Sequence, residues 1–112
     1  MIEKTVMNYL NRKLSPVPCY MEMPEEPSGK YVIIEKTGTS VTNRIETATF
    51  AIQSYGSSLL EAATLNDDVK WAMDDMVELD DVSRVELNSD YNYPDTALKA
   101  YRYQAVFVIT HY

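Results

Sequence analysis

The alternation of apolar and polar positions along the chain predicts two helices. In residues 2–14, apolar side chains recur at helical spacing, and a Pro-rich segment at Pro16 and Pro18 ends the pattern. A second helix is predicted over residues 59–77, beginning at Ser58 and Glu61, which have the spacing of a capping box. The side chains on its predicted core-facing side are Ala62, Leu65, Val69, Ala72, Met73 and Met76.

The remaining apolar segments predict strands. A short strand is expected at residues 19–23, and a long one at residues 30–38. The unbroken apolar run Tyr31 to Ile34 suits a strand that is covered on at least one face and flanked by neighbouring strands. Residues 45–56 alternate as a strand and form a hairpin with the previous one. The polar segment between them, TGTSVTNRIE, is expected to be a long loop that projects from the sheet and is poorly ordered. A further strand carries Val82, Val85 and Leu87. A turn at Pro94 follows it, and residues 100–112 form the last strand.

This order of elements favours an α+β fold. We expect an antiparallel or mixed sheet of four to five strands with two helices packed on one face. The chain has 112 residues, of which 46% are hydrophobic and three are glycine. A chain of this length and hydrophobic fraction can form one domain with a hydrophobic core but is too short for two. Residues 1–112 are therefore expected to form a single domain.

Composition narrows the possible functions. The formal net charge of −7 repels phosphate backbones, and no cluster of Lys and Arg offsets it, so nucleic-acid binding is disfavoured. The longest apolar run, residues 105–109, is too short to cross a bilayer, and no secretory signal is evident. We therefore expect synthesis in the cytoplasm and no membrane partner. The single Cys19 is expected to be a small buried residue without reactivity, and no cofactor is predicted.

Neither a catalytic nor a metal site is predicted. The single His111 stands one residue before the last, where we expect fraying and solvation, and no nucleophile motif accompanies it. Pairs of aspartates recur in and after the second helix, but adjacent helical residues point about 100° apart and do not converge on one ion. At a spacing of seven residues they form two acidic stripes instead: one of Glu61, Asp68 and Asp75, and one of Asp67, Asp74 and, if the helix extends that far, Asp81.

Trp71 does not belong to the core face of the second helix. It projects about 160° from the centre of that face, in line with Leu60 and between the two acidic stripes, and we expect Leu60 to lie beside it. One interpretation is a Trp lying flat over neighbouring aliphatic stems. The other is a contact with a partner protein, since Trp is enriched at the centres of interfaces. Because the surrounding charges are acidic, the partner surface would be basic, with candidates Lys30, Lys36, Arg44 and Arg84.

The chain resembles the phage tail terminator proteins, also called tail completion or minor tail proteins, of siphophages and prophages. The resemblance rests on an opening helix that ends in a Pro-rich segment, and then on the segments YMEMPEEPSGKYVIIEKTG, ATFAIQSYGSSLLEAATLNDDVKWAM and VELNSDYNYPDTALKAYRYQAVFVITH. The pieces AIQSYG before a helix and NYPD before RYQAVFVIT are its most specific parts. None of them is a catalytic motif.

The resemblance implies a structural virion protein, assembled in the bacterial cytoplasm. Such proteins form rings, typically hexameric, that cap the tail tube at its final length and offer a surface for head–tail joining. The implied partners are other copies of the chain, the major tail tube protein and head–tail connector proteins, with DNA passing through the ring without specific binding. A head-closure or connector protein of the same particle is the nearest alternative. A small ligand-binding or enzymatic α+β module is the more distant one, for which a deep polar pocket would be the telling observation.

The same resemblance suggests where neighbouring subunits meet. Tyrosine can bury its ring and keep its hydroxyl hydrogen-bonded, which suits contacts that form on assembly. Tyr101 and Tyr103 are predicted to share one face of the last strand with Ala105 and Phe107, and the outer tyrosines are expected to contact a neighbour. The predicted interface residues are Leu60, Trp71, Arg44, Tyr91, Tyr93 and Tyr101.

Overall fold

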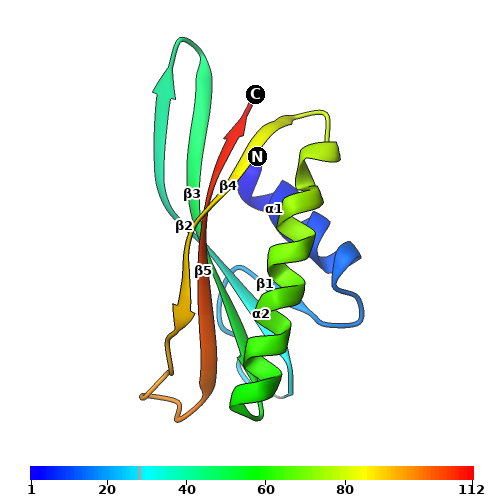
Figure 1. The fold of residues 1–112 in the computed structure, drawn as a ribbon, viewed down its shortest axis with the longest axis vertical. Coiled ribbons are helices and arrows are strands. Elements are labelled where there is room, and N and C mark those ends of the chain that lie inside the picture. The colour runs from blue at the N-terminus through cyan, green and yellow to red at the C-terminus, as the bar shows by residue number, and fades with distance from the viewer. Residues whose placement is uncertain (28) are drawn as a thin grey trace.

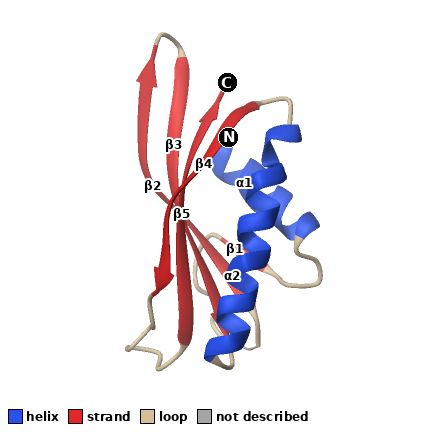
Figure 2. Cartoon of the chain, viewed as in Figure 1, coloured by secondary structure: helices blue, strands red, loops and turns tan. Residues whose placement is uncertain are grey.

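The structure is a computed structural model that describes residues 1–27 and 29–112, and over these residues the chain forms two α-helices and a five-stranded mixed sheet. Figure 1 shows the elements along the chain, and Figure 2 separates helices from strands. The α+β class predicted from the sequence is confirmed. The elements are α1 (Ile2–Lys13), β1 (Cys19–Tyr20), β2 (Tyr31–Thr42), β3 (Ile45–Gly56), α2 (Leu59–Asp74), a 3₁₀ turn (Asp75–Glu78), β4 (Val82–Asn92) and β5 (Tyr101–His111).

The strands follow the order β1-β2-β3-β5-β4 across the sheet. The short β1 runs parallel to β2, and every other neighbouring pair in this order is antiparallel. Both helices lie on the same side of the sheet, as expected (Figures 1 and 2). This arrangement leaves the opposite face of the sheet without a helix.

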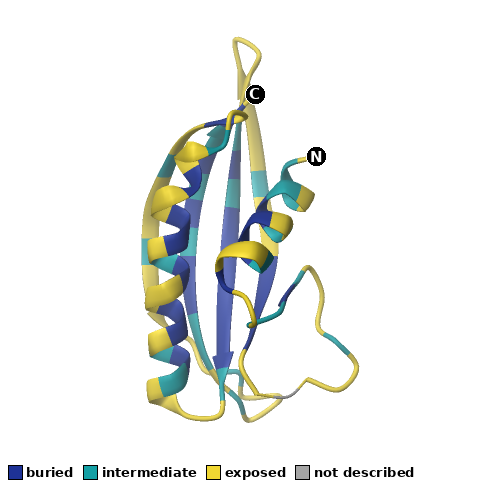
Figure 3. Cartoon of the chain, turned by 90° about the vertical axis from the view of Figure 1, so that its right-hand side faces the viewer, coloured by how far each residue is buried: buried dark blue, intermediate teal, exposed yellow. Residues whose placement is uncertain are grey.

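The main core lies between the helices and the sheet. Val6 and Leu10 of α1 are fully buried there. The six core-facing residues predicted for α2 are all buried, so its helical phase is confirmed. In Figure 3 the inner sides of both helices and the sheet behind them are buried, while the outer side of α2 is exposed. The strands contribute Val32, Ile34, Ala48, Phe50, Ile52, Ala105, Phe107 and Ile109.

A smaller apolar cluster lies on the helix-free face. It is formed by Tyr31, Ile33 and Tyr55, with Tyr20 and Ala100 packed against it. Because successive strand residues point to opposite faces, β2 contributes Val32 and Ile34 to the main core and Tyr31 and Ile33 to this cluster. The unbroken apolar run of β2 is therefore explained by burial on both faces of the sheet.

The polar segment between β2 and β3 is not the long loop that we predicted. The two strands stay paired to Thr42 and Ile45, so only Asn43 and Arg44 form the turn. Both have positive φ, 52° and 68°, as a two-residue type I′ hairpin turn requires. Residues 37–47, which we call the arm, form the end of this hairpin; Glu46 and Thr47 still pair with the end of β5, and the tip projects beyond it (Figure 1). The segment does project as expected, but as an ordered hairpin.

Two smaller predictions also need correction. The first short strand covers only Cys19 and Tyr20, and the side-chain amide of Asn11 holds it by bonding the backbone N–H (2.9 Å) and C=O (3.1 Å) of Cys19. His111 is not frayed or solvated: it pairs with Glu46 on one side and Val82 on the other and is buried. Cys19 is buried as expected, and burial raises the pKa of its thiol to about 12.

Candidate assembly surface

Trp71 stands on the outer side of α2, where the helical phase placed it. The helix begins at Ser58, whose hydroxyl accepts a hydrogen bond from the backbone N–H of Glu61 at 3.1 Å. The Glu61 carboxylate reaches back to the N–H of Ser57 at 2.8 Å, one residue earlier than in a standard capping box. These bonds define where the helix begins, and burial of its apolar face sets its rotation. Trp71 is 73% exposed, so it is a surface side chain and not part of the core.

One side of Trp71 forms the wall of a groove between α2 and the edge strand β4, which we call the Trp71 groove. Its volume is about 440 Å³. The apolar lining comes from Trp71, Val85, Leu87 and Phe107, and the polar rim from Asp67, Lys70 and Asp74. Phe107, in the middle of β5, is buried, whereas Leu87 is half-exposed. An exposed Trp and an exposed Leu beside one apolar hollow are the features expected of a protein contact.

The charges at the rim are only partly neutralised within the subunit. Lys70 Nζ lies 3.3 Å from an oxygen of Asp67 and 3.4 Å from one of Asp90. Burial alone would lower the pKa of Lys70, but these two carboxylates outweigh it and raise the pKa. The lysine charge is thus committed to Asp67 and Asp90. Asp74 is exposed and has no ion-pair partner among the residues that the structure describes.

The other side of Trp71 faces a second groove of about 360 Å³ toward the end of α1. Asp68 and Asp75 line this groove, just as Asp67 and Asp74 line the first. All four aspartates are exposed. The predicted acidic stripes on either side of Trp71 are therefore confirmed for these four aspartates, whereas Asp81 lies beyond the end of the helix and does not continue its stripe.

Leu60 is exposed, as expected, but it is not part of the same surface. Eleven residues separate it from Trp71, which amounts to about 16 Å along the helix axis. It lines a different hollow together with Lys30. The expectation that Leu60 lies beside Trp71 is wrong, because residues that share one stripe of a helix can still be three turns apart.

Arg44 lies at the tip of the arm, far from the helices (Figure 1). It is exposed, and exposed aliphatic side chains flank it at Val41 and Ile45. The other basic candidates are differently placed. Lys36 is bound to Glu3 at 3.0 Å and Arg84 to Glu86 at 3.1 Å, so their charges are already paired within the subunit.

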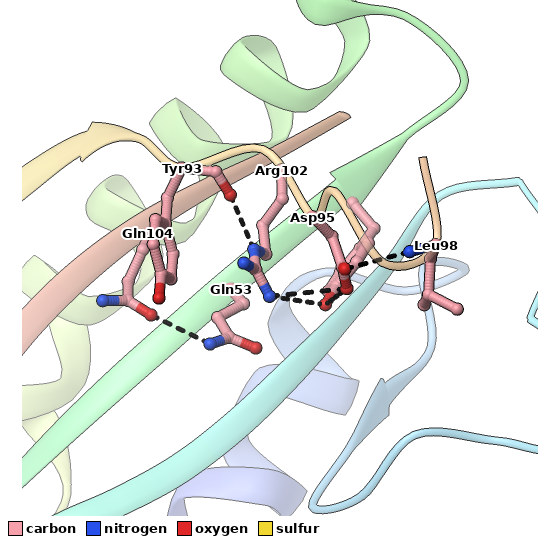
Figure 4. Close-up of polar contacts among 7 residues, drawn as sticks. Gln53, Tyr93, Asp95, Leu98, Arg102 and Gln104 are labelled. Atoms are coloured by element: carbon pink, nitrogen blue, oxygen red, sulfur yellow. Dashed lines mark hydrogen bonds and ion pairs between the residues drawn. The ribbon is translucent and has the colours of Figure 1, made fainter. Parts of the chain in front are cut away.

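Arg102 organises the helix-free face near the Pro94 turn (Figure 4). Its guanidinium lies 4.2 Å from the centre of the Tyr93 ring and donates to the Tyr93 carbonyl oxygen at 2.6 Å and to the Tyr55 hydroxyl at 3.0 Å. Asp95 lies 3.5 Å from the same guanidinium and accepts from the Leu98 N–H at 3.1 Å. Burial alone would raise the pKa of Asp95, but these bonds and the Arg102 charge hold it below its ordinary range.

A second set of contacts continues this network across the sheet. Gln53 donates to Gln104 at 2.9 Å, and Gln104 donates to the Tyr91 hydroxyl at 2.5 Å. Tyr91 in turn meets Tyr93 edge-on, with ring centres 5.8 Å apart. At the inner end, Tyr31 and Tyr55 stack with ring centres 4.6 Å apart. The buried tyrosines on this face are thus those of β2 and β3, whereas Tyr91 and Tyr93 beside the last strand remain half-exposed.

The predicted interface residues do not form one site. Trp71 lies over the helix layer, Tyr91 and Tyr93 lie on the opposite face of the sheet, and Arg44 lies at the tip of the arm. Tyr101 is half-exposed at the start of β5, opposite Gly56 of β3. Its register and that of Tyr103 place both on the face that carries Ala105 and Phe107, as predicted.

Sequence reasoning missed Arg102, Asp95, Gln53 and Gln104. Strand alternation alone would have placed Arg102 and Gln104 on the face opposite Tyr101 and Tyr103. It could not have shown that Tyr55, 47 residues earlier, comes opposite Arg102. Val85 and Leu87 were predicted as strand residues, but their position beside Trp71 was not anticipated.

Over residues 1–27 and 29–112, no helix is long and apolar enough to span a membrane, and no group of three or more potential metal ligands is found. No known protein family matches the sequence. No curated protein matches it either.

Proposed function

We propose that the protein is a structural subunit of a phage tail, a tail terminator that assembles as a hexameric ring. In this role it caps the tail tube at its final length and provides the surface for head–tail joining. Its partners are further copies of itself, the major tail tube protein and the head–tail connector proteins. The proposal starts from the sequence resemblance, which covers nearly the whole chain.

The observation that carries the proposal is the exposure of Trp71 beside the apolar Trp71 groove. A Trp of this exposure costs free energy in water, and truncating such an anchor commonly weakens a complex by about 2 kcal/mol or more. Trp71 is not part of the hydrophobic core of the subunit, whose contribution from α2 comes from other residues of that helix. A contact that forms on assembly accounts for it.

The distribution of surfaces also suits a ring. A closed ring needs one patch that meets a different patch on the next subunit. The Trp71 groove lies between α2 and β4, at one edge of the sheet, whereas the arm extends from the other strands (Figure 1). Two unlike surfaces on separate parts of the subunit are what a head-to-tail contact uses.

The test is electron microscopy of the purified protein, alone and added to elongating tail tubes. We expect closed rings, or discs at one end of the tubes, and tubes that stop lengthening once capped. Trp71→Glu should prevent capping while leaving the circular dichroism spectrum unchanged. Tubes that lengthen equally with and without the wild-type protein would refute the proposed function, and binding to isolated heads instead would favour the connector alternative.

A further inference from the structure

The Trp71 groove has specific requirements of whatever fills it. Its apolar lining, from Trp71 and Leu87 to Phe107, calls for an aliphatic or aromatic side chain. Its rim calls for a positive charge, because Lys70 is committed to Asp67 and Asp90 whereas Asp74 is exposed. An occupant must therefore present a cation next to an aliphatic group on a segment narrow enough to enter.

The tip of the arm has these properties. Arg44 occupies the turn, and Ile45 follows it directly with 44% of its surface exposed. Val41, on the other strand of the hairpin, is 62% exposed. Residues 41 and 45 belong to opposite faces of the arm by their register, so each face of the tip has one exposed aliphatic side chain, and Arg44 stands in the turn between the two strands.

The arm cannot reach the groove of its own chain. Phe50 of β3 pairs with Phe107, which pairs with Leu87 at the groove. From Phe50, the strand β3 runs back six residues to Arg44, which is about 20 Å, while Leu87 lies two strand spacings, or about 10 Å, to the side. The tip and the groove of one subunit are thus well separated, and the tip is available to a neighbour.

We propose that the tip of the arm of one subunit docks in the Trp71 groove of a second copy of the chain, with Arg44 beside Asp74 and Ile45 or Val41 against Trp71 and Leu87. The inference deepens the proposed function, on which it rests for the expectation of a ring. Each subunit carries a net charge of −7, so two subunits repel each other. A contact in which a basic group meets an acidic one offsets this repulsion.

Charge reversal with complementation tests the pairing. Arg44→Glu places a carboxylate against the acidic rim, and Asp74→Lys places an ammonium against Arg44. We expect each variant alone to lose at least about tenfold in self-association, measured by sedimentation velocity at low salt, because like charges would face each other. In an equimolar mixture the two variants can alternate, so that every contact again joins opposite charges. The mixture and the double variant R44E/D74K should both recover association.

Arg84→Glu is the matched control, since it makes the same change of charge at another exposed arginine, one that is paired with Glu86. We expect it to retain association. Circular dichroism should show all variants folded, because Arg44 and Asp74 are exposed and a lysine near the end of α2 suits the helix dipole.

The outcomes separate the two proposals. Wild-type rings that tolerate both reversals, or reversals that the mixture does not rescue, would overturn the docking of the arm and leave the ring itself standing. Rescue that yields only open chains or dimers would support the docking and count against a closed ring. A wild-type protein that stays monomeric at high concentration and on tail tubes would overturn both.

Discussion

The hydroxyl of Tyr55 donates a hydrogen bond to the carboxylate of Asp95 at 3.1 Å, across 40 residues of sequence. The same carboxylate faces Arg102, so it holds the segment after the Pro94 turn against the helix-free face of the sheet. This pairing joins three parts of the chain: β3, the turn and β5. Asp95 therefore stabilises the fold through contacts with residues that are distant in sequence, which a local sequence pattern cannot predict.

Replacing Asp95 with Asn should destabilise the subunit at neutral pH. The variant keeps the shape of the side chain but removes the charge that Arg102 and Tyr55 face, and hydrogen bonds to charged groups contribute about 1.5–3 kcal/mol. Chemical denaturation should show this loss. Asp80→Asn, a change of the same kind at an exposed position, should have little effect.

The loss should also depend on pH. Because the pKa of Asp95 is lowered in the folded state, its contribution is fully present above the ordinary aspartate pKa of about 4 and disappears as pH falls through the lower folded value. The difference in unfolding free energy between wild type and D95N should therefore shrink in acid. A constant difference from pH 7 to pH 2 would contradict this account.

Trp71→Ala should separate folding from assembly. Its side chain is mostly exposed, and surface substitutions usually change stability by no more than about 0.5 kcal/mol, so the thermal midpoint should move by a few degrees at most. Association should weaken by about 2 kcal/mol or more. Association of the wild-type protein should also weaken as the salt concentration rises, because exposed charge pairs are screened over about 10 Å at 0.1 M. Leu60→Ala, equally exposed but outside the Trp71 groove, is the control. A destabilised W71A subunit that still assembles normally would show that Trp71 serves the fold.

Arg44→Gly should stabilise the isolated subunit while weakening its association. A non-glycine residue at positive φ is strained, and glycine at the second position is preferred in a type I′ turn, so we expect a gain of about 0.5–1 kcal/mol. Lys99→Gly relieves a similar strain, at φ 53°, away from the arm, and should leave association unchanged. Comparing thermal midpoints and sedimentation of the two variants tests whether Arg44 is kept for a contact at the expense of the turn. Equal association of R44G and wild type would rule that out.

Gly56→Ala should be strongly destabilising. A Cβ at this position would lie 2.7 Å from the backbone nitrogen of Ala62 in the first turn of α2, and backbone cannot yield as a side chain can. Overpacking of this kind typically costs about 1–3 kcal/mol. Gly38→Ala has open space around the added carbon and should be nearly neutral by urea denaturation. Similar stabilities for both variants would mean that the approach of β3 to α2 can relax.

The sequence was sufficient to predict the helices and the position of Trp71, because helical periodicity is local. Val69 and Met73 recur on one side of α2 at the spacing that a buried face requires, which leaves Trp71 outside. The arm was wrongly predicted to be a loop because it lacks such a local apolar pattern. Its polar, exposed strands have no apolar alternation, so only the Thr-rich composition and the Asn43 turn could have indicated a hairpin.

The Arg102 network could not be predicted because it depends on register between distant strands. Tyr55 meets Arg102 only because β3 and β5 pair in one register out of many, and nothing near either residue specifies the other. The Trp71 groove depends likewise on where β4 runs beside α2. Both are products of tertiary packing and not of local pattern.

The arm continues the ladder of β2 and β3 beyond the point where the core ends. Its two strands are paired with each other, but most of its side chains are exposed, whereas Ala48 and Phe50 further along β3 are fully buried. Paired but uncovered backbone opens by local fluctuation, so hydrogen exchange in the arm should be faster than in the sheet below it and independent of global unfolding. Any partner that grips the tip would slow that exchange. Hydrogen exchange in the arm of the unmodified protein therefore shows directly whether a partner is bound to its tip.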